Sequence, residues 1–309
     1  MSTSPAETGP WTVSRLLAWT REFFERRGLE SPRLCAEILL AHALGCARLQ
    51  LYTQHELVPA PDALDQFRAT VRAAADGHPI AYLTGRKEFF SLAFEVTPDV
   101  LIPRPETEVL VERTIDLVRK SGGTVRTLLD LGTGSGCVAV SLAKHLPEVA
   151  VYASDISGAS LTVARRNADR HGLAERIVFA VGDLFEPWPL QQDGAPAGAP
   201  FDVIVCNPTY VGTAADVPVQ DSVRKYEPAE ALFAGPDGLD VIRRLVAQAP
   251  TRLRPGGYLV LEMAFDHEPA LRALLAQACW QEPAFYRDGA GHRRVVQARR
   301  PKGHAAHVA

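Results

Sequence analysis

Apolar residues recur at intervals of three or four along the first part of the chain. Between Trp11 and about Leu83 this spacing predicts a small bundle of helices. One helix is expected to begin at Ser31-Pro32, because proline is favoured at the first helical position. Another is expected from Asp62 to Asp76, where Gly77 ends it. The aromatic positions here are most simply core residues; a partner-docking face is the alternative interpretation.

The hydrophobic period changes to two between Gly85 and Pro98, and this alternation predicts a β-hairpin. A stiff segment with two prolines follows at 101–108, where Glu106 or Thr107 can cap the next helix. This segment can be read as a rigid linker. An arginine and carboxylates within so short a stretch make a functional role an equally good interpretation.

From Thr127 onward, strands and helices alternate along the chain. Strands are expected at 127–131, 150–154, 177–181, 203–205 and 258–263. One helix is expected after the first of these strands and ends at His145. Further helices are expected at 157–171, 237–249 and 269–278, and a turn is expected at 254–257. Two late segments flank Asp288–Gly291, which predicts a hairpin and an antiparallel last strand. The expected fold class is therefore α/β: a Rossmann-like doubly wound, mostly parallel sheet with helices on both faces.

Composition narrows the class of protein only modestly. The 309 residues are enough for two domains, and 47% hydrophobic with 22% charged residues is ordinary for a globular protein. A net charge of -3 argues against general coating of nucleic acids but leaves room for one specific partner. The five cysteines are scattered without a CxxC pair, so reduced thiols in a cytoplasmic protein are expected, with no metal site. Met1–Pro10 lacks the features of a signal peptide, and no apolar run is long enough to span a membrane.

A glycine-rich turn lies between the first strand of the alternating region and its helix. The turn reads Asp130-Leu-Gly-Thr-Gly-Ser-Gly136, and Asp155 closes the next strand, where an acid can bind ribose hydroxyls. A dinucleotide-binding oxidoreductase would need its third glycine at the position of Cys137. The observed spacing is instead typical of proteins that bind S-adenosylmethionine (SAM).

SAM carries a sulfonium and an ammonium group, so a carboxylate such as Asp130 is favourable beside it. Asp183, after the third strand, is expected to accept a hydrogen bond from the adenine amino group, with Leu184 or Phe185 against the ring. A helix cap or turn cap is the alternative role for Asp183. The expected cofactor residues are Asp130, Gly132, Thr133, Gly134, Ser135, Gly136, Asp155, Ile156, Asp183, Leu184, Phe185 and Asn207.

The buried strand around 203–205 ends abruptly at Asn207-Pro208, because proline cannot continue the ladder. Ligands of open α/β sheets bind at this end of the strands. The Asn207 side-chain oxygen and the Pro208 carbonyl can accept the two N–H bonds of a substrate carboxamide, which directs its nitrogen toward a methyl donor. Tyr210 would wall the pocket and stack on that amide. By itself the tetrapeptide is better explained as an Asx turn; the glycine turn and Asp155 favour the functional interpretation.

Asn207-Pro208-Thr209-Tyr210 resembles the Asn-Pro-Pro-Tyr motif of SAM-dependent amino-methyltransferases, which include adenine-N6 and protein glutamine-N5 enzymes. The linker Ile102–Glu108 resembles the signature of the release factor glutamine methyltransferases, the HemK/PrmC family. Further matches follow in family order at 130–136, 226–228, 235–239 and 287–295. The resemblance covers nearly the whole chain and favours the glutamine enzymes over the adenine enzymes.

This resemblance implies methylation of the glutamine in the Gly-Gly-Gln motif of class-1 peptide-chain release factors. It implies an enzyme that uses SAM and acts on a release factor. A monomer is expected, and the net charge and the short apolar runs predict no stable nucleic-acid or membrane binding. Asn207, Pro208 and Tyr210 are the implied catalytic residues. The implied substrate-binding residues are Pro103, Arg104, Glu106, Thr107, Asn207, Pro208, Thr209 and Tyr210.

With the family in view, the expected domains are a disordered 1–10, a helical substrate-recognition domain at 11–84, a hairpin and linker at 85–104, a methyltransferase domain at 105–300 and a tail at 301–309. Two residues depart from the family pattern. Thr209 replaces the second proline of the motif, and Ala264 stands where the family has glycine. They leave open a member with lowered turnover, or one that binds SAM without catalysis. An adenine-N6 or other amino-group methyltransferase is the remaining alternative.

Overall fold

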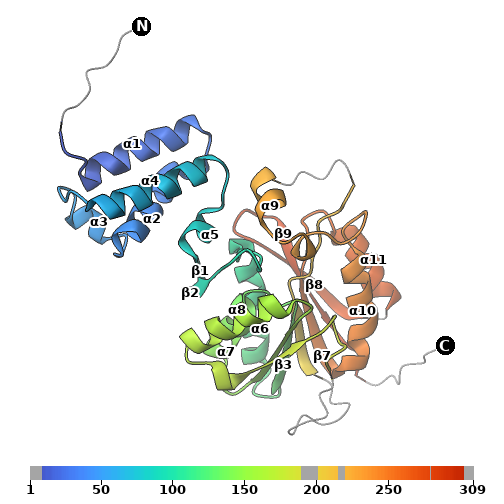
Figure 1. Ribbon diagram of the computed structural model, residues 1–309. Coiled ribbons are helices and arrows are strands. Elements are labelled where there is room, and N and C mark those ends of the chain that lie inside the picture. Colours follow the sequence, from blue (N-terminus) through green and yellow to red (C-terminus); the bar gives the residue numbers. More distant parts are fainter. Residues whose placement is uncertain (1–8, 189–200, 215–219, 279, 303–309) are drawn as a thin grey trace. The chain divides into compact units, whose positions relative to one another are not determined.

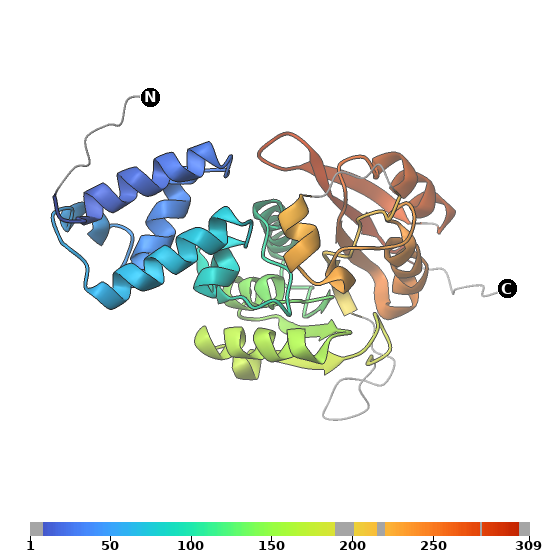
Figure 2. The same cartoon turned by 45° about the horizontal axis from the view of Figure 1, so that its top comes forward.

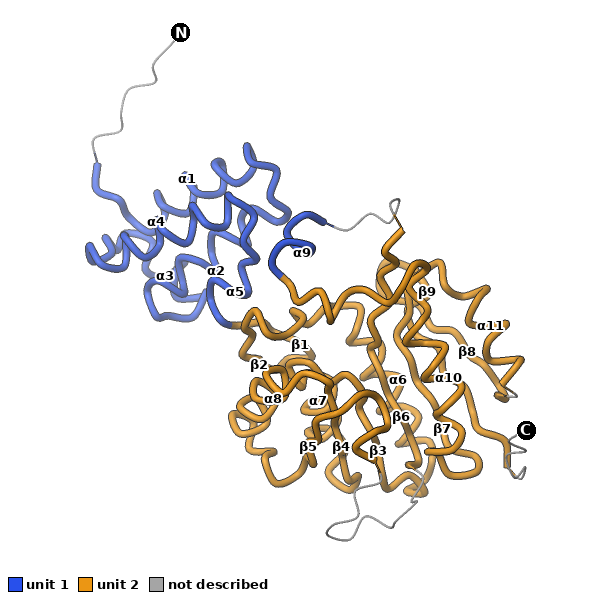
Figure 3. Tube along the Cα trace, turned by 45° about the vertical axis from the view of Figure 1, so that its right-hand side comes forward, with its two compact units in different colours: residues 1–85, 220–226 blue, residues 86–219, 227–309 orange. Residues whose placement is uncertain are grey.

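The computed structural model describes residues 9–188, 201–214, 220–278 and 280–302. The chain divides into two units, Met1–Gly85 with Gln220–Tyr226, and Arg86–Val219 with Glu227–Ala309 (Figure 3). Each unit has its own buried apolar core. The sequence also predicts a mobile low-complexity loop at 191–200, which lies outside the described residues, as do most of the expected disordered segment 1–10 and of the expected tail at 301–309.

The first unit is a bundle of helices whose apolar faces meet in one core (Figure 1). Its helices are α1 (Val13–Arg26), α2 (Pro32–Leu44), α3 (Gln50–Thr53), α4 (Pro61–Ala75), α5 (Ile80–Thr84) and α9 (Asp221–Tyr226). Pro32 is the first residue of α2, as predicted. Phe24 of α1 is buried with Leu39 of α2, whereas Trp19 is 45% exposed. The aromatic positions of α1 are therefore only in part core residues.

The helix α9 is far from the rest of this unit in sequence. Its Tyr226 ring lies 4.2 Å from the ring of His78, measured between centroids, and Gln220 donates a hydrogen bond of 3.3 Å to Glu30. The sequence did not predict α3, α5 or α9, because helices of four to six residues are too short to show a 3.6-residue repeat.

The second unit contains a seven-stranded sheet of order β5-β4-β3-β6-β7-β9-β8. Its strands are β3 (Thr127–Leu131), β4 (Ala150–Asp155), β5 (Ile177–Val181), β6 (Phe201–Cys206), β7 (Leu253–Glu262), β8 (Gln281–Arg287) and β9 (Arg293–Arg299). The strands from β5 to β7 run parallel, and β9 runs antiparallel to both of its neighbours. The predicted doubly wound sheet with an antiparallel last strand is confirmed.

Helices cover both faces of this sheet (Figures 1 and 2). One apolar cluster joins the sheet to α6 (Glu108–Lys120), α7 (Cys137–His145) and α8 (Gly158–Arg170). A second cluster joins the opposite face to α10 (Asp240–Arg252) and α11 (Glu268–Gln277). The predicted hairpin, β1 (Arg86–Phe89) and β2 (Leu92–Glu95), is tied to α8 by Asn167, whose side chain exchanges two hydrogen bonds with the Glu95 backbone at 2.7 and 2.9 Å.

Two predicted boundaries in this unit are wrong. The expected turn at 254–257 lies within β7, which begins at Leu253 opposite Phe201 and shifts register before Val203. The irregular pairing there lets a Pro-Gly-Gly sequence remain in the strand. The helix expected to start at Asp237 starts at Asp240 instead, because the residues before it form a loop.

The strand order brings three predicted site residues to one edge of the sheet. β3 pairs with β4 on one side and β6 on the other, so Leu131 lies opposite both Ser154 and Cys206. Asp130 is the penultimate residue of β3, Asp155 is the last of β4, and Asn207 follows β6. Residues far apart in the sequence therefore converge where parallel strands end.

Candidate active site

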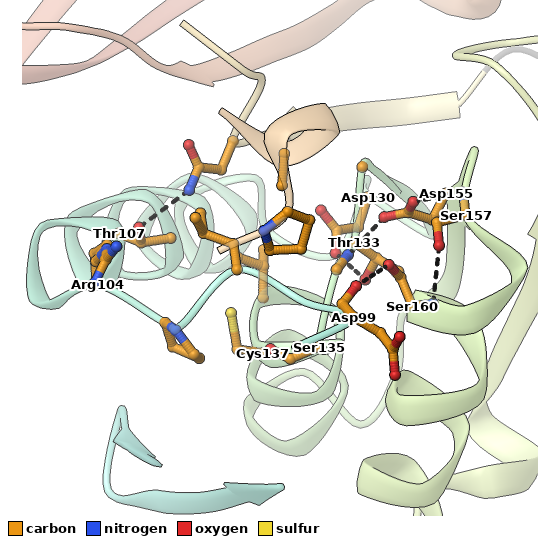
Figure 4. Close-up of a pocket in the computed structure, with 18 of the residues that line it drawn as sticks. Asp99, Arg104, Thr107, Asp130, Thr133, Ser135, Cys137, Asp155, Ser157 and Ser160 are labelled. Atoms are coloured by element: carbon orange, nitrogen blue, oxygen red, sulfur yellow. Dashed lines mark hydrogen bonds between the residues drawn. The ribbon is translucent and has the colours of Figure 1, made fainter. Parts of the chain in front are cut away.

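A cavity opens at these strand ends, and all its lining residues belong to the second unit (Figure 4). Figure 4 shows Asp130, Thr133 and Asp155 together on one side, with Arg104 and Thr107 on the other. The predicted residues that line the cavity are Pro103, Arg104, Thr107, Asp130, Gly132, Thr133, Gly134, Ser135, Asp155 and Asn207. The lining residues that the sequence did not predict are Asp99, Leu101, Cys137, Val138, Ser157, Ser160, Pro228, Glu230 and Ala231.

The glycine-rich turn is held against the end of β4. The Thr133 N–H donates to the Ser154 carbonyl at 3.0 Å, and the Gly134 N–H donates to Asp155 Oδ2 at 2.8 Å. Gly136 has a φ of 80°, and a Cβ there would lie 3.1 Å from the Cβ of Ala164. Only glycine therefore lets α7 begin in contact with α8. Gly136 shapes the turn without lining the cavity.

Two acidic side chains face the same cavity. Asp130 is 1% exposed, and its Oδ2 accepts hydrogen bonds from Thr133 Oγ1 at 2.7 Å and from the Ala139 N–H at 3.1 Å. Burial raises the pKa of Asp130 to about 7, and the charge of Asp155 adds to the shift. Burial also raises the pKa of Asp155, against hydrogen bonds from the Ser157 and Gly134 N–H groups.

These residues fit SAM by the chemistry of their donor set. The buried carboxylates would be stabilised by a ligand with a sulfonium and an ammonium group, and Asp155 has acceptor capacity left for hydroxyls. Gly132 and Gly134 line the cavity without side chains, so a ligand can approach the backbone at the strand ends closely. Among the residues that the structure describes, no group of three metal-ligating side chains is found.

The predicted adenine contacts are placed differently. Asp183 accepts a hydrogen bond of 2.5 Å from Arg244, and Phe185 is 2% exposed in the core beside Trp188. Neither they nor Leu184 and Ile156 are among the lining residues of the cavity. Packing of Leu184 or Phe185 on the adenine ring and the role of Asp183 both stay predictions.

The linker is fastened by a carboxylate that the sequence did not predict. Glu227 is 6% exposed and accepts hydrogen bonds from the Ile102 N–H at 3.2 Å and from Arg104 Nη2 at 2.5 Å. The ion pair fixes the arginine at the cavity. The sequence shows both residues, Glu227 in the segment 226–228 and Arg104 in the linker. It does not predict that they form a pair, because more than a hundred residues separate them.

Thr107 does not cap α6 with its side chain, contrary to one prediction. It is 1% exposed, and its Oγ1 accepts a hydrogen bond of 3.3 Å from Asn207 Nδ2 (Figure 4). The Tyr210 hydroxyl donates to Glu262 Oε1 at 3.0 Å, so its ring is anchored away from the lining of the cavity. Stacking of Tyr210 on a substrate amide stays a prediction.

The segment after Pro208 is held by its neighbours. The Val211 N–H donates to the Leu232 carbonyl, and the Ala234 N–H donates to the Val211 carbonyl, both at 3.0 Å. A Cβ at Gly238 would lie 2.3 Å from the carbonyl oxygen of Tyr210, so the loop packs directly on this backbone. These contacts restrain the chain next to Thr209, where the family has a rigid proline.

Comparison with known proteins identifies both units. Residues 15–85 match the family model described as "PrmC N-terminal domain", and residues 124–293 match "Methyltransferase domain". A "Release factor glutamine methyltransferase" from Rhodopirellula baltica is 42% identical over 290 residues, 93% of this chain and 96% of the relative. Relatives of the same name from Chlorobaculum tepidum (42% identity, 87% of this chain, 90% of the relative) and Geobacter sulfurreducens (39%, 94% and 97%) are similar.

The chain belongs to the release factor glutamine methyltransferase family.

Solved structures agree with a methyltransferase fold. The hMettl16 catalytic domain in complex with MAT2A 3'UTR hairpin 6 has a TM-score of 0.51 at 18% identity and covers 77% of this chain and 81% of that one. The Thermus thermophilus 16S rRNA N2 G1207 methyltransferase, with AdoMet and guanosine, has a TM-score of 0.50 at 22% identity, covering 70% and 49%. At such identities the likeness shows the fold alone.

For a member of the release factor glutamine methyltransferase family, the predicted fold and the predicted cofactor SAM are confirmed. No helix in the described ranges is long and apolar enough to cross a membrane. Sequence reasoning missed Glu262, a fully buried acid at the end of β7. Its signal was a charged residue directly after the apolar run 258–261.

Burial raises the pKa of Glu262 to about 7, although hydrogen bonds from Thr107 and Tyr210 lower it. Burial and the neighbouring Glu262 raise the pKa of the Tyr210 hydroxyl, so this enzyme keeps Tyr210 neutral as a hydrogen-bond donor. Three polar side chains from the linker, β7 and the segment after β6 thus meet behind Asn207.

Proposed function

We propose that this chain methylates the side-chain nitrogen of the glutamine in the Gly-Gly-Gln motif of class-1 peptide-chain release factors, with SAM as the methyl donor. The observation that carries the proposal is the position of Asn207. Its carboxamide lines the same cavity as the glycine turn and the acidic pair. Two relatives named for this activity each align with more than nine-tenths of this chain, and the alignments cover more than nine-tenths of each relative. The likeness therefore includes both units.

Methylation of an amide nitrogen is difficult because its lone pair is delocalised into the carbonyl. When bound, SAM supplies an electrophilic methyl group. Asn207 Nδ2 is engaged by Thr107, so the side-chain oxygen is the group left for the substrate. That oxygen and the Pro208 carbonyl would accept the two substrate N–H bonds, which orients the nitrogen and leaves its lone pair free.

Positive charge builds on the substrate nitrogen during transfer, and two oxygen acceptors stabilise it where it forms. The restrained segment after Pro208 keeps the second acceptor in place although Thr209 is not proline. We therefore propose an active enzyme in preference to a member that only binds SAM.

As part of the same proposal, residues 11–84 bind the release factor, residues 85–104 connect, and residues 105–300 carry the reaction. Pro103 and Arg104 would lie at the substrate side of the cavity. We propose a cytoplasmic monomer without stable nucleic-acid binding, which is supported by the net charge of -3 and by four described cysteines that are all free.

Labelled SAM, the purified enzyme and a purified release factor test the proposal. Label is expected on the wild-type release factor and not on its Gly-Gly-Gln variant with glutamine replaced by alanine. Asn207→Ala is expected to lower kcat by about 100-fold or more, since it removes an aligned acceptor in a water-poor site. Its melting temperature, compared with that of the wild type, serves as the folding control. Equal labelling of both release factors, or undiminished activity of Asn207→Ala, would contradict the mechanism.

Two further arms address the alternatives. Thr209→Pro restores the family residue; because the segment is already restrained, kcat is expected to change by no more than about threefold. Labelling of DNA or RNA, suppressed by salt, would instead indicate an adenine methyltransferase.

A further inference from the structure

The cavity at the strand ends is lined by charged residues of both signs, in very unequal numbers. Four of its lining residues carry carboxyl groups: Asp99, Asp130, Asp155 and Glu230. Among the described residues that line it, only Arg104 has a basic side chain. Figure 4 shows Arg104 on one side of the cavity, with Asp130 and Asp155 on the other. A single cation therefore lies across the site from a pair of acids.

The guanidinium of Arg104 is held by a buried carboxylate that does not itself line the cavity. The Glu227 side chain is 1% exposed; its Oε1 accepts a hydrogen bond of 2.5 Å from Arg104 Nη2, and its Oε2 accepts one of 3.2 Å from the Ile102 N–H. Both carboxylate oxygens are thus engaged by the linker. In the described part of the chain, Glu227 is the one hydrogen-bond and ion-pair partner of this guanidinium. Most of the N–H groups of Arg104 therefore stay available to a ligand.

An arginine held in this way is suited to bind a second carboxylate. Its guanidinium carries N–H groups along more than one edge, so the bond from Nη2 to Glu227 leaves others for a planar acceptor with two oxygens. The ion pair already restrains the long side chain, so little further conformational freedom is lost when a ligand binds. The Arg104 side chain is 28% exposed, so it is partly shielded from water and still lines the cavity.

The amino-acid end of SAM carries an ammonium and a carboxylate on the same carbon atom. The acids at Asp130 and Asp155 suit the sulfonium and the ammonium, but they repel the carboxylate. Without a cation nearby, the carboxylate would be bound next to charges of its own sign. Arg104 is the lining residue that offsets this repulsion.

The three substituents of the sulfonium lead to the same assignment. The ribose is expected at Asp155, the end of β4, and the methyl group must point to Asn207, which follows β6. The third substituent is the amino-acid chain, which is left with the walls formed by the glycine turn and the linker. Asp130 lies beside the turn, so the ammonium fits there and the carboxylate fits at the linker, beside Arg104.

We propose that Arg104, held in place by Glu227, binds the carboxylate of the amino-acid end of SAM. The inference goes beyond the proposed function, because it concerns the cofactor and does not depend on which nitrogen receives the methyl group. It gives Arg104 a contact with SAM where the family resemblance implies a contact with the methyl acceptor. S-adenosylhomocysteine, the product left after transfer, keeps the same carboxylate and is bound by the same contact.

Decarboxylated SAM tests this contact directly, because it keeps the adenosyl, sulfonium and amino groups and lacks only the carboxylate. Calorimetric titration into the enzyme at about pH 6.5 compares the two ligands with both amino groups protonated. Arg104→Met is expected to lower the affinity for SAM and for S-adenosylhomocysteine about tenfold to 100-fold, the usual size of a lost hydrogen bond between charged groups. The affinity for decarboxylated SAM should stay within about threefold of the wild-type value or rise, because a repelling cation is removed.

Three further variants serve as controls. Arg104→Lys keeps the charge without the planar fork, so its SAM affinity should fall between those of the wild type and Arg104→Met. Arg254→Met is the matched control, because Arg254 also pairs with a largely buried carboxylate, that of Asp202 at 3.1 Å, and does not line the cavity. It should leave the affinity for either ligand unchanged.

The third variant guards against misfolding, which the melting temperature of each variant reports. Arg104→Met alone leaves the buried Glu227 carboxylate without its cation, which costs stability. Arg104→Met combined with Glu227→Gln removes both charges. It is expected to show the same loss of preference for SAM over decarboxylated SAM, and it decides the question if the single variant does not fold.

An equal loss of affinity for SAM and decarboxylated SAM, or a SAM affinity of Arg104→Met that matches the wild type, would overturn the inference. In the second case, a higher KM for the release factor would assign Arg104 to the methyl acceptor instead. A wild-type enzyme that labels no release factor would refute the proposed function, while the binding of the two ligands would still decide the role of Arg104.

Discussion

Asp130 should make the affinity for SAM depend on pH, and the raised pKa of the buried carboxyl sets how much the Kd changes. Its pKa is raised to about 7 before a ligand binds, first by desolvation and then by the charge of Asp155. A cationic ligand favours the ionised carboxylate. If only that form binds well, the apparent Kd equals the intrinsic value divided by the ionised fraction. Between pH 7.5 and 6.0 the ionised fraction falls from about three-quarters to about one-tenth, so Kd should rise about eightfold.

The structure offers a conservative variant for this test. Both protein hydrogen bonds to Asp130 end on Oδ2, from Thr133 Oγ1 and from the Ala139 N–H. In Asp130→Asn the amide oxygen can take that place and keep both contacts, while the NH₂ group replaces Oδ1. The variant therefore removes the charge with little change of structure, and its weaker SAM binding should not vary with pH.

Calorimetric titration of SAM into enzyme, at pH values below the titration of its amino group, measures both effects. In two buffers of different ionisation enthalpy, proton release is expected for the wild type near pH 6.5 and not for Asp130→Asn. Asp155→Asn is the companion variant, because Asp155 also has a raised pKa. A wild-type Kd that is constant between pH 6.0 and 7.5, or an unchanged pH dependence in Asp130→Asn, would refute the reasoning.

Three further predictions concern the framework of the site. Glu262 has a pKa raised from 4.5 to about 7, so its contribution to stability is present below pH 4.5 and is lost as the pH rises through 7. In urea denaturation, the free energy of unfolding of Glu262→Gln should therefore exceed that of the wild type by up to about 3 kcal/mol at pH 8 and nearly equal it at pH 4. The opposite order of these two shifts would refute the assignment. Gly238→Ala would push a methyl group against the Tyr210 carbonyl, 2.3 Å away, and should lower kcat more than tenfold while SAM affinity in calorimetry stays within about threefold; normal turnover would show that the loop yields. Asp202 accepts hydrogen bonds of 2.7 and 2.9 Å from two backbone N–H groups at the start of β3, so Asp202→Ala should lose about 2–4 kcal/mol in urea denaturation and Asp202→Asn less, and equal stability of both variants would count against this role.

The fold was predictable because its signals are local. The alternation of buried strands and amphipathic helices after Thr127, with the hairpin before β9, predicts the doubly wound sheet that the structure contains. The glycine turn and the acid after the next strand predict the cofactor, because both follow strand ends that must be neighbours in a parallel sheet. Boundaries failed where the ladder is irregular, as at the start of β7.

The side-chain partners of the site were not predictable in the same way. Arg104 and Glu227, or Thr107 and Asn207, are about a hundred residues apart, and hydrogen-bonding potential alone does not pair them. Phe185 illustrates the same limit. A position after a strand end does not tell whether the ring lies against a ligand or in the core, and the structure buries this ring beside Trp188.

By itself, the sequence determined the order of elements, the glycine turn, the two acids and the carboxamide that ends β6, because each depends on local periodicity or on the backbone limits of glycine and proline. The tertiary structure alone decided which polar groups share a dry interior. Burial behind Asn207 turns Thr107 from a helix cap into its hydrogen-bond partner and raises the pKa of Glu262 to about 7. Desolvation and hydrogen-bond direction depend on neighbours in space, and those neighbours come together only when β3, β6 and β7 pair.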